Sequence, residues 1–243
     1  SEALDIKQSA PADVYAFITS EMNSIKDSLP VKYTASSDMG RATQWAVKGV
    51  LGKVYLTMAG YPLNNTAMLD SARMVLKDII DHEGQYPHLS VTSNYGDLFG
   101  YKNDNQHAIF EVQYITGGVG EGSTFPSQNI PPGLSTSLVN VRSLLFTSSV
   151  QVSSDLINSY NPSDTRFGIT IDTAYPTNDN PPQVGHTPFY KKFVDFGLTT
   201  LTNYDDWPEN FPLLRYEDVK LIYAEVLNDQ AGAPPAEAIA ILK

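Results

Sequence analysis

The sequence contains no cysteine among its 243 residues. This absence excludes disulfide bridges, zinc–thiolate sites and a cysteine nucleophile together. Long apolar runs are also missing, and none approaches the roughly 18 residues that a membrane-spanning helix needs. Residues 1–4 lack the charged segment and the apolar run of a secretory signal peptide. The sequence therefore predicts a folded chain that does not itself cross a membrane.

Basic residues are outnumbered, with 16 Lys and Arg against 27 Asp and Glu and a formal net charge of -11. Apart from the pair Lys191-Lys192, the basic residues are scattered singly. The negative net charge and the lack of a basic cluster make binding to nucleic-acid phosphates or to an anionic membrane surface unfavourable. The acidity favours solubility, and the alternative is a weak preference for divalent cations at a surface loop.

Helical periodicity marks both ends of the chain. Apolar residues recur every three or four positions within 9–30, 41–59 and 66–81, which predicts a first helix followed by an antiparallel helical hairpin. A second hairpin is predicted from residues 215–228 and a short helix after Pro235. The expected fold class is mainly α, with helical hairpins at both ends.

The first hairpin is similar to a tetratricopeptide repeat. Its motif is Leu51-Gly52-x-x-Tyr55 followed by Ala72 and Leu76, although the connecting loop is longer than a 34-residue repeat allows. Lys48 lies where the repeat has Trp. We expect tetratricopeptide-like packing, with the small residues allowing two helices to approach closely.

The middle of the chain, about 88–211, is punctuated by Gly, Pro, Ser, Thr and Asn and predicts a long irregular region. Short strands are expected at 109–115 and 166–173, and a helix at 152–159. Residues 117–122 are Gly-rich and predict a loop. They match no phosphate-binding motif, because neither Gly-Lys-Ser/Thr nor a strand–turn–helix context follows.

Catalytic and metal-binding patterns are few. The four histidines do not have the spacing of a zinc site, and no Gly-x-Ser-x-Gly motif occurs. The acidic segment 205–209 offers paired carboxylates beside an aromatic ring, as glycoside hydrolysis requires, but a solvated loop is the favoured interpretation. Segments 161–164 and 178–180 are calcium candidates, for which turn chemistry is a sufficient explanation.

Several short motifs occur in an order that resembles the SusD/RagB family of outer-membrane nutrient-binding lipoproteins of Bacteroidetes. The resemblance covers nearly the whole chain and includes two departures, His107 for a more frequent Glu and Glu217 for a usual Ala. The motifs are Gly40-Arg41-Ala42-Thr43, Lys53-Val54-Tyr55-Leu56, Tyr95-Gly96-Asp97-Leu98-Phe99, Ile109-Phe110-Glu111-Val112-Gln113, Asp164 with Arg166, and 211–228.

The resemblance implies a single SusD-like domain over 1–243, expected to be an interior fragment of a longer protein. Its helical hairpins would be 9–86 and 212–243, and its ligand-presenting region 88–211. A fragment would expose the apolar terminal residues Val14, Ile18, Ile239 and Leu242. The lipid anchor of the family is absent from this chain, which has no cysteine to carry it.

The resemblance also implies a function. The protein would be non-enzymatic and cofactor-free, and would capture an oligosaccharide at the cell surface for a SusC-like TonB-dependent transporter. A peptide ligand, as in the RagB-like branch, is the close alternative. A glycoside hydrolase on the same loops and a purely structural scaffold are the other hypotheses.

Aromatic residues in the loops are the candidates for stacking on a ligand. We expect Trp207 and Tyr204 to form a stacking platform, with Asp205, Asp206 and Asn203 as hydroxyl partners. The alternative is that Trp207 anchors its loop in the interior. The full set of loop aromatics is Tyr101, Phe125, Tyr175, Tyr190, Tyr204 and Trp207.

Three arginines within the family motifs are expected to be structural. Arg41, Arg166 and Arg215 are predicted to be buried and paired with carboxylates, because an unpaired buried guanidinium is costly. The expected partners are Asp164, Asp218 and Glu225.

Overall fold

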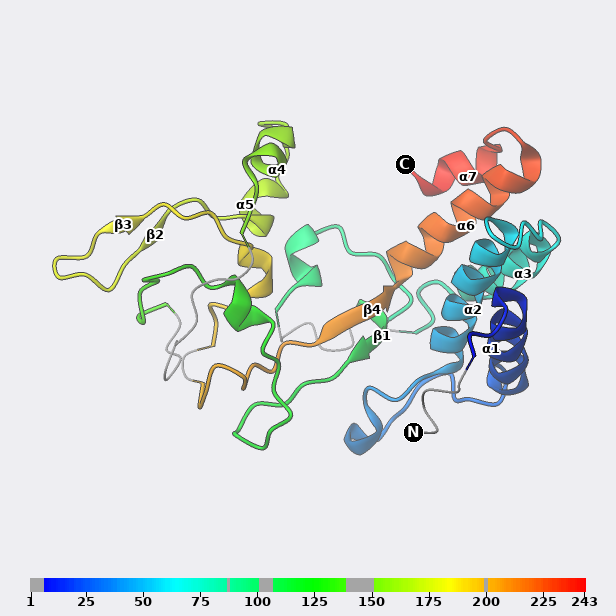
Figure 1. Ribbon diagram of the computed structural model, residues 1–243, viewed down its shortest axis with the longest axis horizontal. Coiled ribbons are helices and arrows are strands. Elements are labelled where there is room, and N and C mark those ends of the chain that lie inside the picture. The colour runs from blue at the N-terminus through cyan, green and yellow to red at the C-terminus, as the bar shows by residue number, and fades with distance from the viewer. Residues whose placement is uncertain (1–6, 87, 101–106, 139–150, 199–200) are drawn as a thin grey trace. The chain divides into compact units, whose positions relative to one another are not determined.

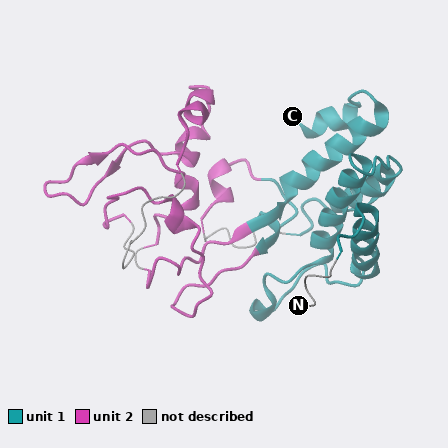
Figure 2. Cartoon of the chain, in the orientation of Figure 1, with its two compact units in different colours: residues 1–91, 105–111, 212–243 teal, residues 92–104, 112–211 magenta. Residues whose placement is uncertain are grey.

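The computed structural model describes residues 7–86, 88–100, 107–138, 151–198 and 201–243. The chain divides into two compact units (Figure 2). Unit 1 comprises residues 1–91, 105–111 and 212–243, and unit 2 comprises residues 92–104 and 112–211. The described residues form seven α-helices and four short strands, so the predicted mainly α fold class is confirmed.

Unit 1 contains the predicted helices from both ends of the chain. Thr43 caps the second of them by accepting a hydrogen bond from the N–H of Ala46 at 3.4 Å. Gly232 ends another with the left-handed backbone that glycine adopts at little cost. The five helices are α1 (Pro11–Ile25), α2 (Gln44–Ala59), α3 (Met68–Ile80), α6 (Tyr216–Ala231) and α7 (Ala236–Ile241) (Figure 1).

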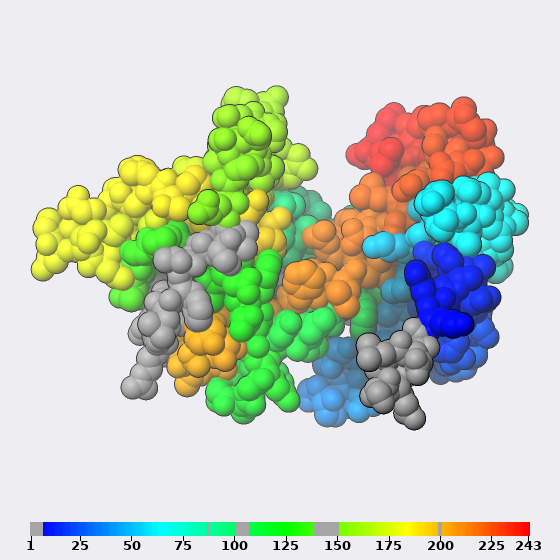
Figure 3. Space-filling view, in the orientation of Figure 1, coloured from blue at the N-terminus to red at the C-terminus, as the bar shows by residue number. Residues whose placement is uncertain are grey.

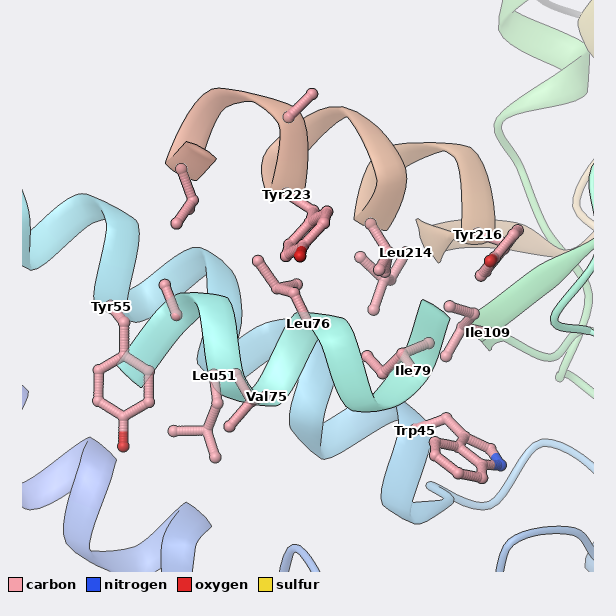
Figure 4. Close-up of a cluster of buried hydrophobic side chains, with 14 of the residues drawn as sticks. Trp45, Leu51, Tyr55, Val75, Leu76, Ile79, Ile109, Leu214, Tyr216 and Tyr223 are labelled. Atoms are coloured by element: carbon pink, nitrogen blue, oxygen red, sulfur yellow. The ribbon is translucent and has the colours of Figure 1, made fainter. Parts of the chain in front are cut away.

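The α2–α3 hairpin depends on close approach at Gly52. A Cβ atom there would lie 2.3 Å from Cδ2 of Leu76, so a larger residue would force the helices apart. Leu51, Leu76 and Ile79 are fully buried in the core of this unit (Figure 4). The tetratricopeptide-like hairpin expected from these residues is confirmed.

Lys48 is a buried cation on α2, with its side chain 8% exposed. Its Nζ lies 2.6 Å from a carboxylate oxygen of Asp78 and 3.0 Å from one of Asp27. It also donates to Gln44 Oε1 at 2.8 Å. These partners offset the loss of hydration, which explains how a lysine occupies the position of the repeat's tryptophan.

Strands β1 (Ala108–Val112) and β4 (Phe211–Arg215) form a two-stranded sheet. The first corresponds to the strand expected at 109–115. The second was not predicted, because the apolar residues after Pro212 run directly into α6 and resemble a helix entry. Proline is tolerated in an edge strand, where its missing N–H breaks no ladder on the open side.

Unit 2 is built from short elements: α4 (Ser154–Ser159), α5 (Phe167–Thr170), β2 (Tyr175–Pro176) and β3 (Val184–Gly185), with short 3₁₀ turns between them. Helix α4 was predicted, and Ser153 caps it by accepting from the N–H of Leu156 at 3.2 Å. The strand predicted at 166–173 is wrong. The turn closed by the Asp164 carboxylate on the N–H of Arg166 leads into helix α5 instead.

The antiparallel β2–β3 hairpin extends from the rest of unit 2 (Figures 1 and 3). Tyr175 pairs with Gly185, and a Cβ atom on that glycine would lie 2.3 Å from the tyrosine ring. Unit 2 has a hydrophobic core of its own. Its buried members are Ile130, Leu134, Tyr175, Phe189, Val194, Leu201 and Trp207.

Helix α1 has no buried side chain, and Val14 on it is 45% exposed while Ile18 is half-buried. Ile239 and Leu242 near the end of the chain are 41% and 65% exposed. The apolar exposure expected at both ends is therefore present at three of the four named residues. Within the described residues, no helix combines the length and apolar character needed to cross a membrane.

Candidate functional site

Trp207 is a buried anchor. Its side chain is 0% exposed, and its Nε1 donates to Ser127 Oγ at 2.7 Å. The backbone N–H of Ser123 donates to the carbonyl oxygen of Trp207 at 2.8 Å. The predicted stacking platform is therefore wrong for Trp207, because the unit 2 core covers the ring and Ser127 satisfies its only polar atom.

Asp206 is also a structural residue, 3% exposed. Its carboxylate accepts from the N–H of Gly117 at 3.0 and 3.1 Å, from the N–H of Gly118 at 2.9 Å and from Thr116 Oγ1 at 3.0 Å. Thr202 Oγ1 donates to it as well. Asp206 was predicted to bind ligand hydroxyls, and this prediction is wrong because the chain itself occupies both oxygens.

The pKa of Asp206 reflects this environment. Burial alone would raise the pKa, but the hydrogen bonds from Thr202, Gly118, Gly117 and Thr116 outweigh burial and hold the pKa well below its usual range. The Gly-rich loop that matched no phosphate motif thus has a clear role. Its backbone N–H groups bind an internal carboxylate.

The rest of the predicted surface is partly open. Asn203 is exposed, while Tyr204 and Asp205 are half-buried. Tyr204 packs against the unit 2 core, and its carbonyl oxygen accepts from Ser127 Oγ at 2.5 Å. These three residues are accessible to a ligand, whereas Asp206 and Trp207 are buried.

A row of four aromatic rings in unit 2 is the stronger candidate for stacking. The ring centroids of Phe125 and Phe193 are 4.9 Å apart, those of Phe125 and Phe211 5.7 Å, and those of Tyr190 and Phe193 6.1 Å. Phe211 is 44% exposed and the other three are half-buried. We call Tyr190, Phe193, Phe125 and Phe211 the aromatic strip.

Two of the four residues of the aromatic strip were predicted from the sequence. Phe125 and Tyr190 were among the predicted loop aromatics, whereas Phe193 and Phe211 were missed. Lys192 adds a cation, with its Nζ 4.8 Å from the centroid of the Phe193 ring. Of the other loop aromatics, Tyr175 is buried at 4% exposure. Tyr101 lies outside the described residues.

Glu209, two residues after Trp207, is a half-buried acid. Burial raises its pKa to about 8, and the charge of Asp195 acts in the same direction. Its Oε1 is buried without a hydrogen-bond partner among the described residues. At neutral pH this side chain is therefore mostly protonated in the folded protein.

The three arginines that were expected to be structural differ in exposure and in partner. Arg166 binds Asp164 through Nε at 2.9 Å and a terminal amino group at 2.6 Å, and it is 62% exposed. Arg215 is 31% exposed, and its Nε lies 3.7 Å from Asp218. The expected pairings with Asp164 and Asp218 occur, but neither arginine is buried as expected, because Arg166 is exposed and Arg215 is half-buried.

Arg41 contradicts the prediction of a buried arginine. Its side chain is 67% exposed, and Nε lies 3.3 Å from Asp38, which was not among the expected partners. Glu225 is exposed on α6 rather than buried against an arginine. Sequence motifs locate these residues but do not reveal which faces of the fold remain open.

The calcium candidates form turns with internal partners. The side-chain oxygen of Asn178 accepts from the N–H of Thr136 at 2.8 Å, and Asp179 accepts from Thr177 Oγ1 at 2.6 Å. The Asp164 carboxylate is bound to Arg166. In the described part of the chain, no three His, Asp or Glu side chains are grouped as a metal site would require.

The fold of this chain is similar to that of solved structures. No family model matches the chain. The fold matches the crystal structure of a SusD homologue from Bacteroides thetaiotaomicron with a TM-score of 0.77 and 23% identity, covering 97% of this chain and 50% of that one. A crystal structure with xylogluco-oligosaccharide is 30% identical with a TM-score of 0.70, covering 89% of this chain and 45% of that one.

A SusD-like protein from Bacteroides ovatus is 38% identical over 107 residues, which are 42% of this chain and 18% of that protein. The helical hairpins and the loop-rich unit thus have the fold of the solved SusD homologues. The chain is similar to SusD-like proteins in sequence and to SusD-superfamily structures in fold. It spans about half the length of the solved structures that it matches.

Proposed function

We propose that this protein binds carbohydrate and captures oligosaccharides at the bacterial cell surface. The observation that carries the proposal is the likeness to the structure with xylogluco-oligosaccharide, which extends over 89% of this chain at 30% identity. That degree of likeness supports a related role and leaves the particular glycan open.

The aromatic strip supplies the chemistry that such binding needs. Sugar rings carry apolar C–H faces that pack on aromatic rings, and polar groups nearby pair with the hydroxyls. Phe211 offers the most exposed ring of the strip, at 44%. In the same unit, Asn203 and Asp205 carry accessible polar side chains. We assign stacking to the aromatic strip in place of Trp207.

We further propose where the protein is located and to which partner it delivers the oligosaccharide. The captured oligosaccharide would pass to a SusC-like TonB-dependent transporter in the outer membrane. The protein would be held at the cell surface by a lipid anchor, as the family resemblance implies. Co-purification of a TonB-dependent transporter with the protein from native membranes tests this part separately from glycan binding.

A catalytic role receives less support from the acidic segment. Glycoside hydrolysis needs two carboxyl groups that reach the substrate. The oxygens of Asp206 are occupied by four residues of the chain, and one carboxyl oxygen of Glu209, Oε1, is buried. We propose that the protein binds glycans without cleaving them and needs no cofactor.

Affinity electrophoresis against a panel of polysaccharides tests the proposal. We expect retarded migration in gels that contain at least one polysaccharide, xyloglucan being the first choice, and no release of reducing ends from it. Retardation by none of the glycans, together with saturable binding of a peptide library in solution, would support the RagB-like alternative. Release of reducing ends would favour the hydrolase.

A further inference from the structure

A groove of about 790 Å³ opens in unit 1 at the C-terminal ends of α2 and α6. Its volume lies within the range of roughly 300 to 1,000 Å³ that is usual for small-ligand sites. The apolar part of its lining includes Leu69, which is buried, and Leu56 and Ile222, which are half-buried. All of the lining residues fall within 53–69 and 222–232, so the groove belongs to unit 1 and is separate from the aromatic strip.

Tyr61 contributes an open aromatic ring to this groove. It is 88% exposed, more than any other large apolar residue in the described part of the chain. The turn that carries it is held by the N–H of Asn64, which donates to the carbonyl oxygen of Gly60 at 2.7 Å. The N–H of Asn65 also donates to the carbonyl oxygen of Met58 at 3.0 Å. Because the turn is already ordered, a ligand can pack on the ring without the cost of ordering a loop.

Two acidic residues of α6 line the same groove. Glu225 and Asp229 are exposed and four positions apart, which places both carboxylates on one face of the helix. Lys53 on α2 is the basic residue of the lining. Among the described residues, none of these three side chains takes part in an ion pair. Two negative charges against one positive charge give the lining a net charge of -1.

The positions of the two acids are unfavourable for helix α6 by itself. Like charges four positions apart repel each other, and Asp229 lies in the last turn, where the unpaired carbonyl oxygens favour a cation. Neither α2 nor α6 has a basic residue in its last turn, and both helices end at the groove, at Gly60 and Gly232. Such departures from local preference are expected at functional sites. A bound cation would relieve both of them.

We propose that this groove is a second binding site, which takes a small amino sugar with a protonated amine. The ammonium group would bind the carboxylates of Glu225 and Asp229. The apolar C–H face of the sugar would pack on Tyr61, and Asn228 would bind a hydroxyl group. This site lies in unit 1 and is independent of the proposed oligosaccharide binding in unit 2, so failure of one proposal leaves the other intact.

Nuclear magnetic resonance titration of the backbone amides tests the proposal directly. The amides of Gly60 and Gly232 report on the groove from α2 and from α6. The probes are D-glucosamine, N-acetyl-D-glucosamine and n-butylamine at about pH 6, where both free amines are protonated. We expect saturable shifts at both glycines with D-glucosamine. The other two probes should bind at least about tenfold more weakly, because one lacks the charge and the other lacks the sugar ring.

Matched variants separate the contributions of the charge and of the ring. Glu225→Gln should weaken D-glucosamine binding about three- to fivefold, as expected for one exposed ion pair. It should not lower the melting temperature, because it removes the repulsion with Asp229. Glu21→Gln, at an exposed acid on α1, should bind like the wild type. Tyr61→Ala should weaken binding by at least about threefold, whereas Tyr61→Phe keeps the ring and should not.

Saturable shifts with D-glucosamine that both Glu225→Gln and Tyr61→Ala weaken would support the site. The proposal is overturned if D-glucosamine gives no saturable shift, if N-acetyl-D-glucosamine binds as tightly, or if Glu225→Gln binds as tightly as Glu21→Gln does. Equal binding of n-butylamine would overturn it as well, because the groove would then take any alkylammonium group, such as a lysine side chain of a protein partner.

Discussion

The carboxylate of Asp206 binds the backbone N–H of Gly117 through both of its oxygens, at 3.0 and 3.1 Å. The two residues are 89 positions apart in the sequence, so this contact joins two loops of unit 2. Gly117 has a φ of 119° and Gly118 a φ of 73°, which turn their N–H groups toward one acceptor. A charged acceptor makes these hydrogen bonds stronger than neutral ones.

Asp206→Asn should destabilise the protein by about 2 to 3 kcal/mol, because a neutral amide accepts less strongly and offers a single oxygen. Urea unfolding measures the loss. Asp205→Asn, at the neighbouring half-buried position, should change the free energy of unfolding by less than about 0.5 kcal/mol. Equal effects of the two variants would contradict the assigned role of Asp206.

The same carboxylate should make the protein sensitive to acid. A lowered pKa in the folded state means that the ionised form stabilises the fold at pH values above the unfolded pKa of about 3.8. This contribution is lost as the pH falls below that value. The melting temperature of the wild type should therefore fall more steeply below about pH 4 than that of Asp206→Asn.

Trp207→Ala should lower the free energy of unfolding by about 3 to 5 kcal/mol, as expected for removal of a fully buried aromatic side chain. The melting temperature measures the change. At temperatures where the variant stays folded, glycan binding should persist, because the ring does not reach the surface. Loss of binding without any change in melting temperature would restore the stacking role.

Gly122 should tolerate no side chain. A Cβ atom there would lie 2.3 Å from the carbonyl oxygen of Asp205 and 2.4 Å from Cα of Asp206, and backbone atoms cannot move aside easily. Gly122→Ala should thus lower the melting temperature strongly. Gly168→Ala is the control, since nothing lies within 4 Å of the added atom. A harmless Gly122→Ala would mean that the two loops do not pack this closely.

Glu209 should make the protein less stable as the pH rises. The folded state keeps its proton up to about pH 8, whereas the unfolded carboxyl loses it near 4.5. The folded state thus binds more protons between these values, and the free energy of unfolding must decrease with pH there, by up to about 1.4 kcal/mol per unit.

Glu209→Gln removes this titration and should flatten the decrease, which thermal melting across the pH series measures. The exposed Glu121 provides the control, and Glu121→Gln should keep the wild-type slope. A wild-type slope in Glu209→Gln as well would show that another group is responsible.

Local sequence patterns predicted the helices of unit 1 because their apolar periodicity and small residues are themselves local. Gly52 and Leu76 are an example, since both belong to the recognised repeat-like motif. Strand β4 was missed because its partner strand, β1, lies about a hundred residues earlier in the sequence. In the sequence, β4 runs directly into α6, and no turn residues separate the strand from the helix.

The ligand surface was predicted less well for a related reason. A loop with two aromatics and several polar groups suits either a binding platform or an anchor, and only distant residues decide between them. Trp207 is covered by the core of unit 2 and bound to Ser127, 80 positions earlier. Phe211 was overlooked because it begins a motif that resembled a helix entry.

Isothermal titration of the protein with a xylogluco-oligosaccharide tests the central claim most directly. We expect saturable binding that Phe211→Ala weakens at least about tenfold, with an unchanged melting temperature. Phe17→Ala, at a phenylalanine that is 67% exposed on α1, should bind like the wild type. Saturable binding that is equally strong in all three proteins would contradict the aromatic strip, and no binding of any oligosaccharide by the folded protein would contradict the proposed function itself.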